Sequence, residues 1–236
     1  MSSQRYVKKK SKDDGEKPFW ISFSDLMTAL MVMFLVVMAV ALLAVTSPAS
    51  EFEERKSAWV NELEEMLLSD FPEVHYQRDK RTIDFGSQAN FKSGTSEFDG
   101  GPNEIKVKEE ALRKFIPALL SLANNKLVQD VVKQFVVEGY TDTRGDYLFN
   151  LDLSLQRSQR LLCILGDESG QFTLTPAHRK QVRDLFLVGG YSFNKEKSNE
   201  LESRRIEIRI EFLGAKEKRD PPPQTTVEFG KCRLQK

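Results

Sequence analysis

One apolar stretch near the N-terminus constrains this chain more than any other feature. The run Leu26–Val45 has no ionisable residue and is apolar apart from Thr28. About 20 helical residues cross the hydrocarbon core of a bilayer, because a helix rises about 1.5 Å per residue and the core is about 30 Å thick. The rest of the chain is strongly charged, which disfavours a buried core helix of this length. We therefore predict a transmembrane helix over residues 18–46.

A cleavable signal peptide is the main alternative, because Ser47-Pro48-Ala49 resembles a small-residue cleavage site. The apolar run is much longer than the roughly 7–15 apolar residues of a signal peptide, and a carboxylate, Asp25, directly precedes it. We therefore favour an uncleaved single-pass anchor in a bacterial inner membrane. Residues 1–17 are rich in lysine and arginine, whereas the first charges after the helix are acidic. The positive-inside rule then predicts a cytoplasmic N-terminal tail and a periplasmic C-terminal domain.

Charge and residue content exclude several classes of function. The chain has 35 basic and 35 acidic residues, so no net charge draws it to nucleic acid. The two histidines, His75 and His178, are too few and too far apart for the ligand set of a metal hydrolase. We find no nucleophile–base arrangement and no glycine-rich phosphate loop. The sequence therefore predicts a protein that is not an enzyme and needs no cofactor.

The chain after the membrane helix divides into a linker, a domain and a tail. Pro48 is expected to end the membrane helix, and Ser50 with Glu53 resembles a capping box that opens an amphipathic helix within the linker, residues 47–79. Residues 80–213 form one α/β (α+β) domain, and residues 214–236 are a tail with a proline run. Apolar periodicity predicts helices over 107–120, 153–165 and from Pro176 to about 185, and strands near 83–85, 135–137 and 205–212.

One motif in the domain resembles a known family, the OmpA-like peptidoglycan-binding domains. The resemblance covers roughly residues 80–213 and implies a βαβαβ-type fold with a mixed sheet and helices on one side. Ser158 and Ser203 depart mildly from the usual pattern. The matching residues are Gly139-Tyr140-Thr141-Asp142, Gly145, Asn150, Leu153-Ser154 and Arg157, together with Phe91–Gly94 and Arg204–Ile206.

The residue types in this motif suit a zwitterionic ligand. The diaminopimelate of peptidoglycan stems presents an ammonium and a carboxylate on one short arm. Asp142 could bind the ammonium and Arg157 could bind the carboxylate through two parallel hydrogen bonds. Thr141 and Asn150 complete the predicted peptidoglycan-binding residues. The structural alternative is a simple Asp142–Arg157 salt bridge, with Asn150 stabilising a turn.

A second motif surrounds Asp25 at the cytoplasmic end of the membrane helix. The stretch Ser24–Met31 resembles the membrane helix of MotB-type stator subunits. This resemblance implies ion translocation, by protons, at Asp25. It also implies a homodimer of this chain within a pentamer of MotA/ZorA-like multi-span subunits. The alternative is a carboxylate that reaches the headgroups and has no function, since such a charge costs only about 2.5–3.5 kcal/mol at mid-membrane and less near the edge.

Three whole-protein interpretations remain at this point. The short linker and the sequence leading into Asp25 resemble the ZorB family of Zorya anti-phage defence, which we favour. The alternatives are a flagellar MotB-type stator subunit and a passive single-span peptidoglycan tether. In an oxidising compartment Cys163 and Cys232 could form one disulfide, although two free thiols are also compatible with the sequence.

Overall fold

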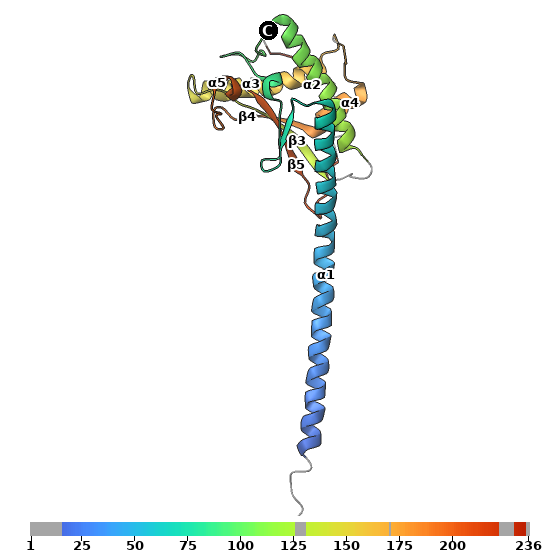
Figure 1. The fold of residues 1–236 in the computed structure, drawn as a ribbon. Helices are drawn as coiled ribbons and strands as arrows, with labels where there is room; N and C mark the ends of the chain where they lie inside the picture. The colour runs from blue at the N-terminus through green and yellow to red at the C-terminus, as the bar shows by residue number, and fades with distance from the viewer. Residues whose placement is uncertain (1–15, 126–130, 170, 222–228, 235–236) are drawn as a thin grey trace, which may run out of the picture. The chain divides into compact units, whose positions relative to one another are not determined.

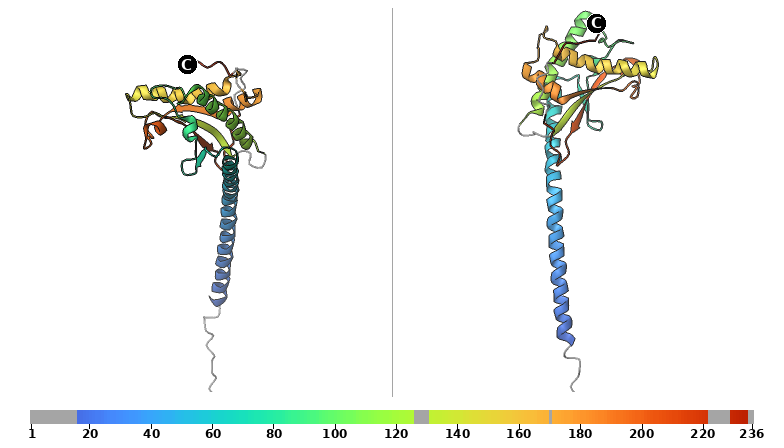
Figure 2. Two further views of the ribbon diagram at one scale, coloured as in Figure 1. Left: turned by 45° about the horizontal axis from the view of Figure 1, so that its top comes forward. Right: turned by 180° about the vertical axis from the view of Figure 1, so that it is seen from behind.

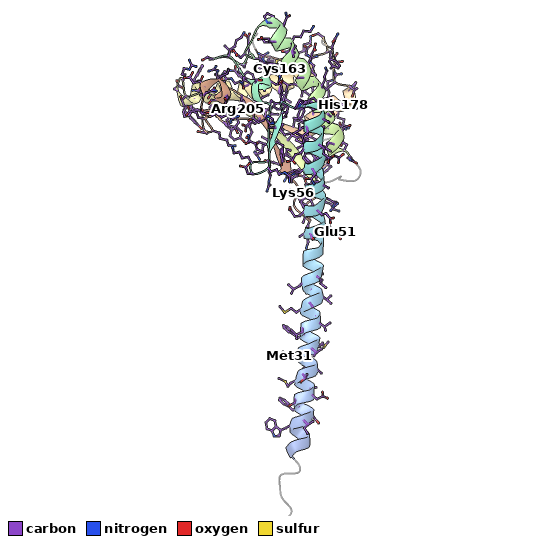
Figure 3. The ribbon with its side chains drawn as sticks, in the orientation of Figure 1. Met31, Glu51, Lys56, Cys163, His178 and Arg205 are labelled. Atoms are coloured by element: carbon purple, nitrogen blue, oxygen red, sulfur yellow. A yellow bond between two sulfur atoms is a disulfide. The ribbon has the colours of Figure 1, made fainter. Side chains whose placement is uncertain are left out.

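The computed structural model describes residues 16–125, 131–169, 171–221 and 229–234. The chain separates into two units, Met1–Ser50 and Glu51–Lys236, which we describe one at a time (Figure 1). In the first unit, helix α1 (Glu16–Asp70) begins and carries the apolar run. Side chains along this run are exposed on the bare chain, as Met31 illustrates (Figure 3). Among the described residues, α1 is the helix long and apolar enough to cross a membrane.

Pro48 does not end this helix, and that prediction was wrong. α1 continues through it as far as Asp70, so Ser50 and Glu53 lie inside a helix and do not open a new one. Proline removes one main-chain hydrogen bond and costs a helix about 3 kcal/mol, which is a local penalty. The helix-forming residues on both sides outweigh it, so the expected break between the membrane helix and the amphipathic helix is absent.

The second unit begins with the amphipathic part of α1, which packs into its own domain. Trp59 and Leu63 are completely buried, and the indole of Trp59 meets the ring of Phe212 edge-on at 5.7 Å. Phe52 and Leu67 are also buried. This stretch, which we expected to be a linker helix, is therefore part of the hydrophobic core.

A five-stranded mixed sheet forms the centre of the domain, in the order β1-β2-β5-β3-β4. β3 and β4 are parallel, and the other neighbouring pairs are antiparallel. The expected strands are present, whereas the first and fourth were not predicted. The bounds are β1 His75–Gln77, β2 Thr82–Asp84, β3 Val132–Gly139, β4 Phe186–Gly190 and β5 Ile206–Phe212.

Helices cover one face of this sheet, as expected (Figure 2). Phe115 of α2 and Leu161 of α3 share the core with the cross-strand pair Val137 and Ile208. The cap predicted for the third helix is confirmed, since the Thr175 hydroxyl accepts a hydrogen bond from the His178 amide and proline follows at the first position. The helices of this unit after α1 are η2 Gly86–Ala89, α2 Pro102–Ala123, α3 Tyr147–Gly166, α4 Pro176–Leu185 and α5 Glu200–Ser203.

The opposite face of the sheet carries a network of charged side chains. Glu138 is 1% exposed and accepts hydrogen bonds from the Tyr140 hydroxyl at 2.5 Å and from Arg209 Nε at 2.6 Å. Burial opposes ionisation of this carboxyl, but the hydrogen bonds outweigh burial and hold the pKa of Glu138 below its usual range. The alternation of β5 therefore separates an apolar face from an ionic face.

The C-terminal segment Phe229–Leu234 is attached to α3. A disulfide joins Cys163 and Cys232, with 2.08 Å between the sulfurs, so the bonded state is the one that the structure contains. The ring of Phe229 also packs directly against Gly166. A Cβ added to Gly166 would stand 2.7 Å from Cδ1 of Phe229. The tail is thus held by one covalent bond and one close apolar contact.

Reduction of this disulfide is expected to destabilise the domain by about 3–4 kcal/mol, because a crosslink over 69 residues restricts the unfolded chain. Chemical unfolding of the full chain in detergent, with and without reductant, measures the change. The variant Cys163→Ser/Cys232→Ser is the control and should not respond to reductant. A wild-type unfolding midpoint that stays constant while two thiols become titratable would contradict this expectation.

Candidate functional site

Asp142 lies in the turn that follows β3, between two arginines. Its Oδ2 accepts a hydrogen bond from Arg204 Nη1 at 2.9 Å and lies 3.3 Å from Arg144 Nη2. The main chain positions this turn, because the Thr141 amide donates to the carbonyl of Ser192 at 2.9 Å. Burial opposes ionisation, but the hydrogen bond from Arg204 and the nearby charges hold the pKa of Asp142 below its usual range. Asp142 is therefore a buried, ionised carboxylate at neutral pH.

Arg157, on α3, is a completely buried cation held by main-chain carbonyls. Nε donates to Thr95 O at 3.0 Å, Nη1 to Tyr140 O at 2.8 Å and Nη2 to Lys92 O at 3.0 Å. Within the described part of the chain, no carboxylate oxygen lies within 4.0 Å of the Arg157 guanidinium, so Arg157 forms no ion pair there. Burial lowers the pKa of Arg157 to about 10, so the guanidinium is still charged at neutral pH. This cation lacks a bonded counter-ion.

The geometry changes two expectations about this pair. The structural alternative, a direct Asp142–Arg157 salt bridge, is not formed, because Arg204 and Arg144 are the partners of Asp142. Arg157 also does not present a free fork, since all three of its nitrogens already donate to carbonyls. A guanidinium has five N–H groups, so one on Nη1 and one on Nη2 remain outside these three bonds.

Asn150 and Thr141 are both 1% exposed and lie around the same turn. The Asn150 amide nitrogen donates to Arg144 O at 2.8 Å and to Asp146 O at 3.1 Å, which is the turn-stabilising role of the structural alternative. Within the described ranges of the chain, its Oδ1 has no hydrogen-bond partner, and neither does Thr141 Oγ1. An unpaired buried polar atom costs about 1–3 kcal/mol. The site therefore contains two buried polar atoms that a ligand or an ordered water could satisfy.

The loop 91–98 is fixed to the site by three arginines. Arg157 binds the loop carbonyls of Lys92 and Thr95, and Arg160 Nε donates to Ser96 O at 2.9 Å. Arg204 Nε donates to Phe91 O at 2.9 Å while its Nη1 binds Asp142. Arg204 thus connects the loop to the carboxylate. Arg204 belongs to the family motif, but the sequence did not predict its role in the site.

Two glycines allow α3 to lie directly on the sheet. A Cβ on Gly139, at the end of β3, would stand 1.9 Å from the carbonyl oxygen of Ser154. A Cβ on Gly190, at the end of β4, would stand 2.7 Å from Leu151 O. This backbone contact sets the height of α3 above the sheet and therefore the position of Arg157.

Asp25 belongs to the other unit and is not part of this cluster. Asp25 is exposed on α1. Near it on the same helix, the hydroxyl of Thr28 donates a hydrogen bond to the carbonyl oxygen of Ser24 at 2.7 Å. The predicted residues thus form two groups. Thr141, Asp142, Asn150 and Arg157 gather around the turn after β3, whereas Asp25 stands alone on the apolar helix.

Comparison with known proteins identifies the family. Residues 4–46 match the family described as membrane MotB of the proton-channel complex MotA/MotB. The Zorya protein ZorB of Escherichia coli O139:H28 is 40% identical over 222 residues, covering 91% of this chain and 88% of that protein. The chain belongs to the ZorB family. A second ZorB, from E. coli ATCC 8739, is 26% identical to this ZorB-family chain. The match covers 84% of this chain and 90% of that protein.

Solved structures resemble the C-terminal unit more distantly. A putative MotB-like protein from Desulfovibrio vulgaris is 16% identical, with a TM-score of 0.43. The match covers 70% of this chain and 96% of that protein. The periplasmic domain of Helicobacter pylori MotB is 19% identical, with a TM-score of 0.36, covering 59% and 80%. The ZorB-family chain is thus a MotB-like, single-pass membrane protein with a mixed-sheet domain, as the sequence predicted.

Proposed function

We propose that this chain is the peptidoglycan-anchored B subunit of a proton-driven rotary membrane motor that acts in Zorya-type anti-phage defence. The observation that carries the proposal is its close relation to ZorB over nearly the whole chain. The N-terminal tail is cytoplasmic, the apolar helix crosses the inner membrane, and the mixed-sheet domain lies in the periplasm. The subunit binds and conducts; it is not an enzyme.

Wall binding is assigned to the cluster around Asp142. Arg157 is a buried cation without a bonded carboxylate, and a ligand carboxylate would supply one. Asp142 is an ionised carboxylate that could accept a ligand ammonium in competition with Arg144, whose side chain is more than half exposed. Thr141 and Asn150 offer buried polar atoms beside it, and these atoms have no partner in the described part of the chain. These features support a ligand with both charges on one arm, as in the diaminopimelate of a peptidoglycan stem.

Ion conduction is assigned to Asp25 and requires partner chains. A single span cannot enclose a water path, so other helices must form its walls. We propose two copies of this chain within a pentamer of MotA/ZorA-like multi-span subunits. A partner helix against Asp25 would give the carboxylate polar neighbours that lipid does not offer. Protons could then bind and leave as the two kinds of subunit move past each other.

Two other functions fit less well. A flagellar stator subunit would share the MotB match at residues 4–46, but the 40% identity to ZorB favours defence. A passive tether would have no use for Asp25 in its membrane helix. The identity of the neighbouring gene would distinguish defence from locomotion. Survival of cells exposed to phage tests the defence role directly.

Asp142→Asn is expected to weaken binding of the full chain, in detergent, to purified sacculi by about tenfold or more. The substitution keeps the shape of the side chain but removes the charge that would bind an ammonium. Sedimentation with sacculi measures the bound fraction. The control is Asp152→Asn, which removes the same charge from an exposed position on α3 where Asp152 accepts a hydrogen bond from Gln156.

Circular dichroism should show that both variants are folded. Equal sedimentation of Asp142→Asn and wild type would show that Asp142 does not bind the wall. Its role would then be structural, as the ion-pair partner of Arg204.

A further inference from the structure

A second candidate site lies away from the Asp142 cluster, in a cleft of about 990 Å³. Its walls come from α2, α3 and the start of α4, and the disulfide-linked segment Phe229–Leu234 borders it. None of Thr141, Asp142, Asn150 or Arg157 lines it. The Cys163 label in Figure 3 marks where the tail is bonded to α3. Nothing in the proposed wall-binding or ion-conducting role uses this cleft.

The side chains lining the cleft are mainly basic. Six of them are cationic and three are anionic, which leaves an excess of three positive charges. The basic residues come from four different segments, so they surround the space and do not form one exposed helix face. They are Arg113, Arg160, Arg179, Lys180, Arg183 and Lys231, against Glu109, Asp167 and Glu168.

Arg113 provides the observation that points to a ligand. Its side chain is 4% exposed and lines the cleft from α2. Nη2 is paired with Asp167 Oδ2 at 3.1 Å, but Nε and Nη1 are buried and have no hydrogen-bond partner among the residues that the structure describes. Buried guanidinium nitrogens are normally satisfied, because leaving a charged donor unpaired is costly. An oxyanion in the cleft would satisfy them.

The start of α4 adds to the positive potential. Pro176 opens this ten-residue helix at the edge of the cleft, and Arg179, Lys180 and Arg183 follow on it. The N-terminal end of a helix carries a partial positive charge that favours anions. Arg179 is paired with Glu168 at 2.6 Å and Arg183 with Asp184 at 3.0 Å, so part of this charge is neutralised within the chain. Lys180 has no carboxylate partner among the salt bridges of the described residues.

We propose that this cleft binds a phosphate-bearing ligand with more than one negative charge. Guanidinium groups on separate helices can each bind phosphate oxygens through paired hydrogen bonds, and Lys180 and Lys231 act as compact charges. The cleft volume matches the upper part of the usual range for small-molecule sites, about 300–1,000 Å³. The disulfide keeps Lys231 at the site, because it fixes the neighbouring residue, Cys232, to α3.

Calorimetric titration of the full chain in neutral detergent with inorganic pyrophosphate tests the proposal. We expect saturable binding at one site per chain. Arg179→Gln/Lys180→Gln should weaken it by about tenfold or more, since two cations of the cleft are lost. The control is Lys216→Gln/Lys218→Gln, which removes the same charge from two exposed residues outside the cleft and should bind as wild type does.

Arg113→Met provides a second variant, with similar length but no donors. Its binding should also weaken by about tenfold or more, provided that circular dichroism shows a folded domain. Should this buried substitution prevent folding, the Arg179→Gln/Lys180→Gln variant still decides the question. Absence of saturable heat, equal affinity in the cleft double variant and its control, or equally tight binding of citrate would each overturn a phosphate site in this cleft.

Discussion

Asp25→Asn is expected to abolish protection against phage while leaving the chain in the membrane with its partners. Asparagine has nearly the same shape as aspartate but cannot gain or lose a proton, so packing is kept and the ion step stops. Each proton that crosses provides about 2.3 kcal/mol per 100 mV of membrane potential, and no other group in the apolar run could take over its transfer. Plaque counts on cells carrying the complete defence system measure protection, and co-purification measures assembly.

Two matched variants make this result specific. Asp25→Glu keeps an ionisable carboxyl and should retain part of the protection. Asp70→Asn removes the same charge at the C-terminal end of α1 and should leave protection unchanged. Full protection by Asp25→Asn would refute ion translocation at this residue, and the passive-tether interpretation would then be preferred. Loss of co-purification would instead show that Asp25 is needed for assembly.

Gly139→Ala is expected to destabilise the periplasmic-type domain by about 3 kcal/mol, because the new methyl would overlap the backbone of α3. The nearest atom, Ser154 O, is 1.9 Å from the Cβ position, and a main-chain carbonyl cannot rotate away as a flexible side chain would. The helix must lift from the sheet and lose packing along its length. The midpoint of urea unfolding measures the effect.

The control for this substitution is Gly214→Ala, where the added Cβ would make only ordinary contact with Glu217, at 3.6 Å. Its unfolding midpoint should stay within the roughly 0.5 kcal/mol typical of surface changes. Gly139→Ala should also bind sacculi less well, because α3 carries Arg157 and Asn150. An unchanged midpoint would show that α3 can move away from β3 at little cost.

Local patterns in the sequence were sufficient for the longer elements. The strict alternation of Ile206, Ile208 and Ile210 with charged residues predicted β5, and Thr175-Pro176 predicted the start of α4. β1 and β4 were missed because three and five residues give too little periodicity, and β4 is only partly buried. Pairing with neighbours, which a local pattern cannot show, makes these segments strands.

The candidate site was predicted in its composition but not in its pairing. The motif indicated Asp142 and Arg157, which both lie at the turn after β3. The shorter of the two ion pairs of Asp142, however, is with Arg204, 62 residues away, and it forms because β5 enters the sheet beside β3. Arg157 is likewise bound by carbonyls of a loop more than 60 residues earlier. Sheet order decides such partners, and no spacing within the motif contains that order.

The disulfide also has a mechanical consequence for the domain. Both strands that flank β3, namely β4 and β5, lie inside the covalent loop closed by Cys163 and Cys232. If tension opened the domain, the 69 residues of this loop could not be drawn out, which removes roughly 230 Å of extensible chain. A load between the membrane helix and the Asp142 cluster would run through residues that precede Cys163, so the crosslink acts on the part of the domain behind that path. It would keep the strands next to β3 tied to α3 after local unfolding, close enough to pair again.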